Sequence, residues 1–480
     1  MMKLISKNRP YFNRRDLFAI LKFGQRGNIK RFEKRFAEFV NAKYALSFPY
    51  ARSAIWALLK IWEGAGSNYG SRTSIVKSDF TNKNEVIVSA YTCTVVAHAV
   101  IKAGFRPRFV DIELDSYNPK TEEILSVISD KTKAIIPVHT FGNVMDLDKI
   151  VNNLPRKDIL IIEDSALCPK PIYKNTGYPN MVSIYSLGHT KHFSTVEGGM
   201  VATDNEEIYK KLLEFRNKNF RKADLFLHFK NFLHFFIRYF IFGKTGYYFL
   251  DALKNLKMLE KFYDERSMNE ISLPKDFNVL FSEWQARLGL NQLGKASEIL
   301  EKRRKIAEFY YNELKDFHSD VISQPIGERR SDRPTTSLRG SEAQPLSQKG
   351  LDEATEAILQ KRREVEIASR HAPLCSARGR NDEIKFLDSF NSLWSHYPVR
   401  IIGRDAKLIR EKMKQKGIEA GVTFDYSLPE LPVFREYRDR EFPNSKKAAS
   451  EMINLPNYLS LSDKDTAHII KSLKDILKSI

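Results

Sequence analysis

The chain has 480 residues, of which 42% are hydrophobic and 12% aromatic, and it carries a formal net charge of +19. This is the composition of an ordinary globular protein, and the length predicts two or three domains. Its three cysteines, Cys93, Cys168 and Cys375, lack the short paired spacings of a disulfide framework or a metal knuckle, so we expect a reducing compartment and no metal site.

The positive charge is partly local, because residues 210–261 contain twelve Lys/Arg against four Asp/Glu. A basic surface suits nucleic acid, an anionic membrane or a phosphorylated substrate, so the charge alone identifies no partner. Residues 1–15 contain no uninterrupted apolar stretch behind their basic residues. We therefore expect no secretory signal and a cytoplasmic protein.

The first 222 residues predict an N-terminal arm, at 1–26, and then a large α/β domain. Phe32, Phe36 and Val40 recur at helical spacing, and farther on the apolar strands EVIVSA, RFVDI, KAIIPV and ILIIED alternate with amphipathic helices. This alternation predicts a mostly parallel sheet covered on both faces, which we assign to residues 27–222. In such sheets, ligands bind at the carboxyl ends of the strands.

An aromatic and basic insertion follows, at 223–270. Lys230, Arg238 and Lys244 interrupt every stretch of 225–250 that would be long enough to cross a bilayer. One interpretation is an interfacial element at the inner face of the membrane, with Phe and Tyr among lipid headgroups. The other is a buried helical pair or an oligomer contact.

Residues 271–322 predict helices that connect the large domain to a smaller one. Ser, Arg, Pro, Gly and Gln then dominate 323–386, which predicts a disordered or loosely ordered low-complexity insertion. Its twelve Lys/Arg and ten Asp/Glu favour a passive insert over one that binds a polyanion, so we expect no nucleic-acid partner. A strand and a helix resume afterwards and predict a small α+β domain at 387–480.

Two neighbouring segments, IIEDSA and SIYSLGHTKHFSTVEGGMVAT, carry the strongest chemical signal. The first ends a buried strand in Glu163 and Asp164, which places an acid at the carboxyl edge of the sheet. Lys191 follows another short strand and precedes a Gly-Gly turn, so its amine can face the same crevice. A desolvated lysine has a lowered pKa, and its neutral amine can bond to an aldehyde.

Such an acid and lysine are what pyridoxal phosphate requires, since the acid keeps the pyridine nitrogen protonated and the lysine holds the aldehyde. Each residue alone would be a weak signal. A strand-terminal Asp is more often a turn or a helix cap, and a single Lys is nearly always on the solvated surface.

Together with the sequence around them, these residues are similar to those of the DegT/StrS family of pyridoxal-phosphate-dependent sugar aminotransferases of fold type I. The similar phrases occur in the family's order: FEKRFAEFVNAKYAL, ARSAIWALL, VIVSAYTCTVVAHAVIKAG, KTKAIIPVHTFGN, IEDSA, the lysine segment with EGG, and FSEWQARLGLNQL. The resemblance runs from about residue 28 to residue 479, apart from the two insertions. It implies a mostly parallel, mixed sheet of the seven-stranded type between helices, with a smaller α+β C-terminal domain.

The resemblance also implies the cofactor, pyridoxal 5'-phosphate, and its ligands. Asp164 would pair with the ring nitrogen, and Lys191 would carry the cofactor. Ser186 would bind the cofactor phosphate, aided by the backbone N–H groups of the turn at Arg52 and Ser53 that opens a helix. An ordinary helix cap is the alternative for that turn.

Two further residues follow from the same resemblance. Tyr91 would stack on the cofactor ring, and the alternative is a core tyrosine at the end of a strand. Asn278 would reach the phosphate bound by a partner subunit, which implies a homodimer with active sites shared between its subunits.

Three positions depart from the family's pattern. Leu167 stands where a glutamine usually bonds to the phenolic oxygen of the cofactor, and a leucine cannot make that bond. His192 replaces an asparagine and Leu280 an arginine. Lys191 itself is kept, which argues against the family's dehydratases, where histidine replaces it.

We therefore expect transfer of an amino group, with glutamate as the donor, to a nucleotide-linked keto sugar for cell-surface polysaccharide or related glycan synthesis. Leu167 and His192 motivate an alternative, elimination from a sugar without transamination. The third hypothesis is a catalytically lapsed homologue that serves as a membrane-associated scaffold through residues 225–250.

Overall fold

The computed structural model describes residues 4–9, 11–21, 26–63, 84–168, 176–223, 225–241, 268–315, 317, 384–385 and 396–479. By its internal contacts the chain divides into two units, 1–317 with 384–480 and 318–383. The described residues all belong to the first unit, so most of the insertion predicted for 323–386 lies outside them. The domain boundaries drawn from the sequence stay predictions.

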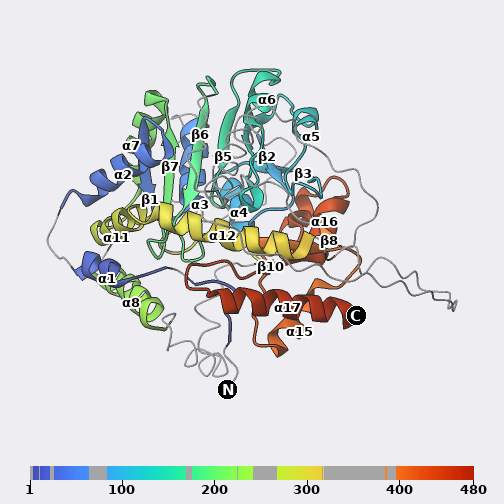
Figure 1. Cartoon of the computed structure of the whole chain (residues 1–480). Coiled ribbons are helices and arrows are strands. Elements are labelled where there is room, and N and C mark those ends of the chain that lie inside the picture. Colours follow the sequence, from blue (N-terminus) through green and yellow to red (C-terminus); the bar gives the residue numbers. More distant parts are fainter. Residues whose placement is uncertain are drawn as a thin grey trace, which may run out of the picture. The chain divides into compact units, whose positions relative to one another are not determined.

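A seven-stranded sheet forms the centre of the large domain (Figure 1). Its strands, in chain order, are β1 (Tyr44–Phe48), β2 (Glu85–Ser89), β3 (Arg106–Val110), β4 (Thr132–Ile136), β5 (Leu160–Asp164), β6 (Met181–Ser186) and β7 (Gly199–Thr203). In space their order is β1-β7-β6-β5-β4-β2-β3, and β2 to β6 pair in parallel. Only β7 runs against its two neighbours. This confirms the mostly parallel, mixed sheet predicted from the sequence.

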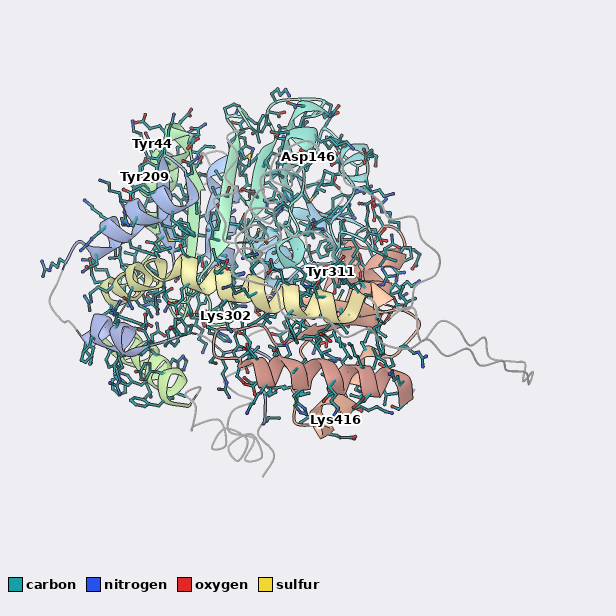
Figure 2. All side chains as sticks on the ribbon, viewed as in Figure 1. Tyr44, Asp146, Tyr209, Lys302, Tyr311 and Lys416 are labelled. Atoms are coloured by element: carbon teal, nitrogen blue, oxygen red, sulfur yellow. The ribbon has the colours of Figure 1, made fainter. Side chains whose placement is uncertain are left out.

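Helices cover both faces of this sheet, as its nearly continuous apolar strands require. They are α2 (Asn28–Val40), α3 (Ala51–Trp62), α4 (Thr94–Lys102), α5 (Thr121–Ser126), the 3-10 turn η2 (Thr140–Gly142), α6 (Leu147–Asn152), α7 (Glu206–Asn219) and α11 (Glu283–Leu293). One face packs on α5 and α6, through a buried cluster that includes Ile87, Ile135 and Ile161. The other packs on α3 and α4. At the edge of the sheet, the rings of Tyr44 and Tyr209 stack with their centroids 4.6 Å apart (Figure 2).

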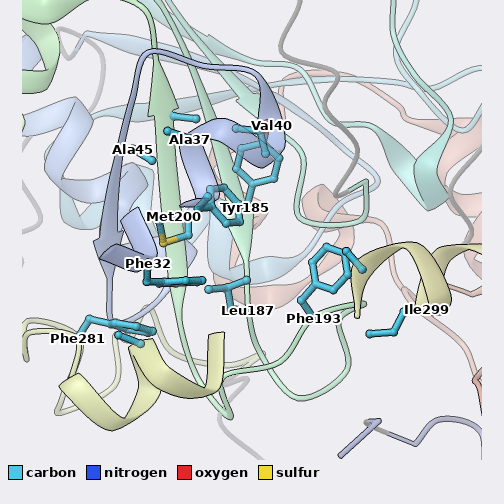
Figure 3. Close-up of a cluster of buried hydrophobic side chains, with 14 residues drawn as sticks. Phe32, Ala37, Val40, Ala45, Tyr185, Leu187, Phe193, Met200, Phe281 and Ile299 are labelled. Carbon is cyan, nitrogen blue, oxygen red and sulfur yellow. The ribbon is translucent and has the colours of Figure 1, made fainter. Parts of the chain in front are cut away.

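A second buried cluster lies beneath β6 and β7, where Tyr185, Leu187 and Met200 meet the apolar side of α2 (Figure 3). Phe32 of α2 stacks on Phe281 with a centroid distance of 5.9 Å. The helical spacing seen in the sequence of α2 is therefore the spacing of its core contacts. This cluster supports the two strands whose connection carries Lys191.

The small domain contains a three-stranded antiparallel sheet of β8 (Ile384–Lys385), β9 (Tyr397–Ile401) and β10 (Met452–Leu455). Its other elements are α15 (Ala406–Gln415), η3 (Leu428–Glu430), η4 (Pro432–Tyr437), α16 (Pro443–Glu451) and α17 (Asp463–Ser479). The long helix α12 (Ala296–Lys315) joins the two domains. Its first turn contributes Ile299 to the buried cluster of the large domain, and its Tyr310 hydroxyl donates to the carbonyl of Pro456 in the small domain. These elements confirm the predicted α+β character. β8 shows that the last residues of the predicted insertion belong to the small-domain sheet.

The N-terminal segment is fastened to the small domain. The N–H of Ile5 donates to the carbonyl of Gly417 at 2.8 Å, and the N–H of Glu419 donates back to the carbonyl of Ile5 at 2.8 Å. Helix α1 (Arg14–Leu21) then packs against α11. Ile5 thus forms an isolated parallel β-bridge with Ile418.

The aromatic segment predicted for 225–250 begins with a helix, α8 (Leu225–Ile241), and its remainder lies outside the described residues. In Figure 1, α8 lies beside α1. Among the described helices, none is long and apolar enough to cross a membrane.

Candidate active site

The predicted site residues follow strands that end at one edge of the sheet. Because β1, β2, β5 and β6 run in the same direction, their carboxyl ends meet at that edge, and β7 begins there. Asp164 ends β5, Ser186 ends β6, and Lys191 lies in the connection from β6 to β7. The fold therefore brings together residues that lie up to 27 positions apart in this part of the sequence.

Asp164 is almost fully buried, on the side of the sheet that packs on α3 and α4. Its Oδ1 accepts a hydrogen bond from the N–H of Ala166 at 2.9 Å. Burial raises the pKa of the Asp164 carboxyl above its ordinary value, whereas the Ala166 N–H and the charge of Lys191 oppose that rise. Lys191 is thus close enough for its charge to stabilise the Asp164 carboxylate.

Lys191 is half-buried in a short irregular loop, where its N–H donates to the carbonyl of Gly188 at 3.0 Å. Two residues later, Phe193 enters the buried cluster beneath β6 and β7 (Figure 3). Asn8 of the N-terminal segment donates from Nδ2 to the carbonyl of Thr190 at 3.0 Å. The loop is therefore fixed on both sides of the lysine, and the contact from Asn8 was not predicted from the sequence.

Ser186, Gly199 and the start of α3 converge next to this loop. Ser186 pairs with Gly199 in the sheet, and a Cβ added to Gly199 would lie 2.4 Å from the backbone nitrogen of Ala51. Only a glycine lets the first turn of α3 approach the strand so closely. Tyr50, the N-cap residue of α3, makes no side-chain capping hydrogen bond. A helix start of this kind, beside a serine hydroxyl, is suited to hold a phosphate.

The two residues predicted at the start of α3 differ in their contacts. The guanidinium of Arg52 lies over the ring of Tyr50, 4.8 Å from its centroid. Ser53 is fully buried, and its hydroxyl donates to the carbonyl of Phe277. The hydroxyl proton of Ser53 is thus already donated within the protein, so of Ser53 only the backbone N–H is suited to an anion.

Asn278 lies beside the same helix start within its own chain. Its carbonyl accepts from the N–H of Arg221 at 2.9 Å, and the preceding carbonyl, of Phe277, is the acceptor for Ser53. The segment around Asn278 therefore borders the start of α3, where the cofactor phosphate is predicted to bind. Its reach into a partner subunit stays a prediction.

Tyr91 is fully buried, and its hydroxyl donates to the carbonyl of Phe424 at 3.2 Å. Its ring meets that of Phe424 edge to face, with a centroid distance of 5.3 Å. The ring offers no exposed face in this arrangement, which matches the alternative of a core tyrosine. Of the loop residues 91–93, Cys93 is the one that is only half-buried. Stacking of Tyr91 on a cofactor stays a prediction that would require its neighbours to move.

A buried polar network surrounds Glu163, the residue before Asp164, whose side chain lies on the opposite face of the sheet. The Nδ1 of His139 accepts from the N–H of Met145 at 3.1 Å, so its Nε2–H donates to Glu163, 2.7 Å away. The hydroxyl of Ser183 also donates to Glu163. This network satisfies a buried carboxylate and positions the end of β5. The residue pattern alone pointed to an acid at this edge, and only the family resemblance selected Asp164 over Glu163.

The residues present fit pyridoxal phosphate. Lys191 supplies an amine for the aldehyde, and Asp164 supplies a buried acid close to that amine. The close approach at Gly199 provides an anion-binding end beside Ser186. Leu167 and His192, the departures noted in the sequence, are both buried in this region.

Replacing Gly199 with alanine should damage both the phosphate end and the fold, because the new methyl group would collide with the backbone of Ala51. We expect the free energy of unfolding to fall by about 1–3 kcal/mol. Pyridoxal phosphate should bind about tenfold more weakly, since α3 must move away from the site. Urea unfolding and absorbance titration with the cofactor measure the two effects.

Gly294→Ala is the matched control, because a Cβ there comes no closer than 3.4 Å to Asn291 and needs no unusual backbone angle. Its free energy of unfolding should stay within about 0.5 kcal/mol of wild type. If Gly199→Ala also retained wild-type stability and affinity, the tight junction between β7 and α3 would not matter for cofactor binding.

Comparison with known proteins agrees with this geometry. A family model described as the DegT/DnrJ/EryC1/StrS aminotransferase family matches residues 20–342 and 349–474. Among solved structures, Helicobacter pylori PseC, an aminotransferase involved in the biosynthesis of pseudoaminic acid, is similar with a TM-score of 0.65 and 19% identity. That alignment covers 100% of both chains.

Two relatives by sequence bear on the chemistry. The spore coat polysaccharide biosynthesis protein SpsC of Bacillus subtilis is 24% identical, over 94% of this chain and 90% of its own length. A GDP-4-keto-6-deoxy-D-mannose 3-dehydratase of Yersinia pseudotuberculosis is 30% identical, over 63% of this chain and 68% of its own length.

Proposed function

Since the chain belongs to the DegT/DnrJ/EryC1/StrS aminotransferase family and is a pyridoxal-phosphate-dependent aminotransferase, we propose that it aminates a nucleotide-linked keto sugar, with glutamate as the amino donor. We further propose that the product enters polysaccharide or related glycan synthesis. The homodimer and the cytoplasmic location stay predictions.

The observation that carries this proposal is the proximity of Lys191 to Asp164. A half-buried lysine lies close to a buried acid, and their charges interact. When bound, the cofactor supplies an electron sink for carbon–nitrogen chemistry. Lys191 would hold the cofactor and then move protons at its Nζ, while Asp164 would keep the ring nitrogen protonated.

The names of the relatives support the choice of substrate class. The name of SpsC refers to polysaccharide biosynthesis. PseC is described as an aminotransferase involved in the biosynthesis of pseudoaminic acid.

A second candidate function is elimination from a deoxy sugar, favoured by the similarity to a 3-dehydratase and by Leu167 and His192 near the lysine loop. Retention of Lys191 favours amine transfer, because a neutral amine can both hold the cofactor and carry protons.

The decisive experiment incubates the enzyme and cofactor with glutamate and a panel of keto-sugar nucleotides. Amine transfer requires one 2-oxoglutarate for each amino sugar formed, whereas elimination alters the sugar without that stoichiometry. If no sugar on the panel depends on glutamate for conversion and no 2-oxoglutarate appears, the proposed transfer is wrong. Turnover of neither kind would favour a lapsed enzyme.

A further inference from the structure

A row of large apolar side chains on α8 faces solvent. Phe229, Leu233 and Phe240 are 65%, 45% and 59% exposed. Their spacing of four and then seven residues places them on one face of the helix. Single exposed apolar residues are ordinary on a protein surface, but a row of three along one helix marks a contact surface.

The opposite face of α8 is held in the protein. Phe235 is fully buried in a cluster with Ile20 of α1 and with Trp284 of α11, and Phe12 meets Phe235 at a centroid distance of 5.0 Å. The helix therefore cannot turn its exposed row inward without removing Phe235 from this cluster. The exposure of the row is a property of how α8 packs.

The neighbouring helix α1 adds a second exposed apolar pair, Phe18 and Leu21, which are 62% and 40% exposed. They are three residues apart and so share one face of α1. The helix also exposes Arg14 and Arg15, whereas its acid, Asp16, is buried. We call Phe18 and Leu21 together with the α8 row the apolar rows.

Asp16 points into the protein and not toward solvent. Its carboxylate forms an ion pair with Lys295, with 2.5 Å between Oδ2 and Nζ. The acid of α1 is thereby neutralised internally, and the cations that α1 exposes have no acid of the same helix beside them at the surface. This helix therefore presents apolar and positively charged groups together.

The sequence of the α8 segment also combines apolar side chains with positive charges. Residues 225–250 contain Lys230, Arg238 and Lys244 and no Asp or Glu. Apolar side chains together with cations, without acids, are the pattern of an element that lies in the interface of an anionic membrane.

We propose that the apolar rows of α1 and α8 bind the surface of an anionic lipid bilayer, with the aromatic side chains among the headgroups. A second copy of the chain is a poorer occupant. A symmetric contact would bring together two identical surfaces that each expose Arg14 and Arg15, and α1 would supply no countercharge, whereas anionic headgroups supply it. This proposal does not depend on the sugar substrate.

The test is flotation of the full-length holoenzyme with vesicles of phosphatidylglycerol and phosphatidylcholine in equal parts, compared with vesicles of phosphatidylcholine alone. We expect the protein to float with the anionic vesicles, and less so at high salt, because salt screens the attraction. The triple variant Phe229→Ser, Leu233→Ser, Phe240→Ser should partition at least about tenfold more weakly. A double variant, Phe18→Ser with Leu21→Ser, tests the row on α1 separately.

The matched control replaces three other exposed apolar residues, Val144, Phe309 and Leu408, with serine, and it should float like wild type. Circular dichroism and cofactor absorbance verify that each variant is folded. The proposal is overturned if the wild-type protein does not float with anionic vesicles, or if the α8 triple variant floats as well as wild type. Loss of self-association in that variant, with no vesicle binding by wild type, would instead identify a contact between copies.

Discussion

Replacing Lys191 with alanine is expected to lower amine transfer by at least about 10⁴-fold, because the variant loses both the covalent hold on the cofactor and the proton carrier. The visible absorbance of the lysine-bound cofactor should disappear as well. Loss of this positive charge should also raise the pKa of Asp164 further, since Lys191 now stabilises its carboxylate.

Two other lysine variants separate these effects. Lys191→Arg keeps a charge near Asp164 but cannot form the bond to the aldehyde, so it should be as inactive as Lys191→Ala. Lys210→Ala removes an exposed lysine that pairs with Glu206 on α7, and it should behave like wild type.

The chemical readout is borohydride reduction of the holoenzyme followed by peptide mass analysis. The cofactor should be found on the peptide that contains Lys191, and on no peptide of the Lys191→Ala protein. If another lysine carries the cofactor, or if Lys191→Ala keeps wild-type turnover, the assignment of Lys191 is wrong.

Local pattern was enough to predict a mostly parallel sheet covered by helices, whereas its seven-stranded mixed form was implied by the family resemblance. Strands β2, β4 and β5 are short apolar runs between amphipathic helices, and this alternation specifies a parallel sheet whatever the rest of the chain does. The directions of these strands then place Asp164 and Ser186 at one edge. The position of Lys191 beside them follows from the short connection between β6 and β7.

Contacts between segments that are distant in the chain could not be predicted from the sequence. The approach of Gly199 to Ala51 depends on the pairing of β1 with β7, and the bond from Asn8 to Thr190 joins residues 182 positions apart. Neither leaves a periodic signal. For the same reason the sequence could not show that Tyr91 would be enclosed by side chains such as Phe424, which comes from the other end of the chain.

Replacing Asp164 with asparagine should lower amine transfer on the order of 10²–10³-fold, because a neutral amide cannot hold the ring nitrogen in its protonated form. The amide oxygen can still accept the hydrogen bond from the Ala166 N–H, so the loop after β5 should keep its shape. Lys191 should still carry the cofactor in this variant, and borohydride reduction measures that separately from turnover.

Glu163→Gln is the control one residue earlier, because Glu163 belongs to the network with His139 and Ser183 on the opposite face. It should cost about 1–3 kcal/mol in the free energy of unfolding, since it weakens a buried charged hydrogen bond. Its turnover should stay within about tenfold of wild type. Equal loss of turnover in both variants would mean that Asp164 has no special role at the ring.

The raised pKa of Asp164 should also affect how the stability of the cofactor-free enzyme depends on pH. Burial favours the protonated carboxyl, so the folded protein binds more protons than the unfolded chain as the pH rises above the ordinary aspartate value of 3.8. The stability contributed by this residue is therefore present at low pH and is lost as the pH rises through the folded pKa. Asp164→Asn cannot ionise, so at neutral pH its cofactor-free form should unfold at a higher urea concentration than wild type, and this advantage should vanish in acid. A variant that is equally or less stable at neutral pH would show that Lys191 and the Ala166 N–H fully offset the burial of this carboxylate.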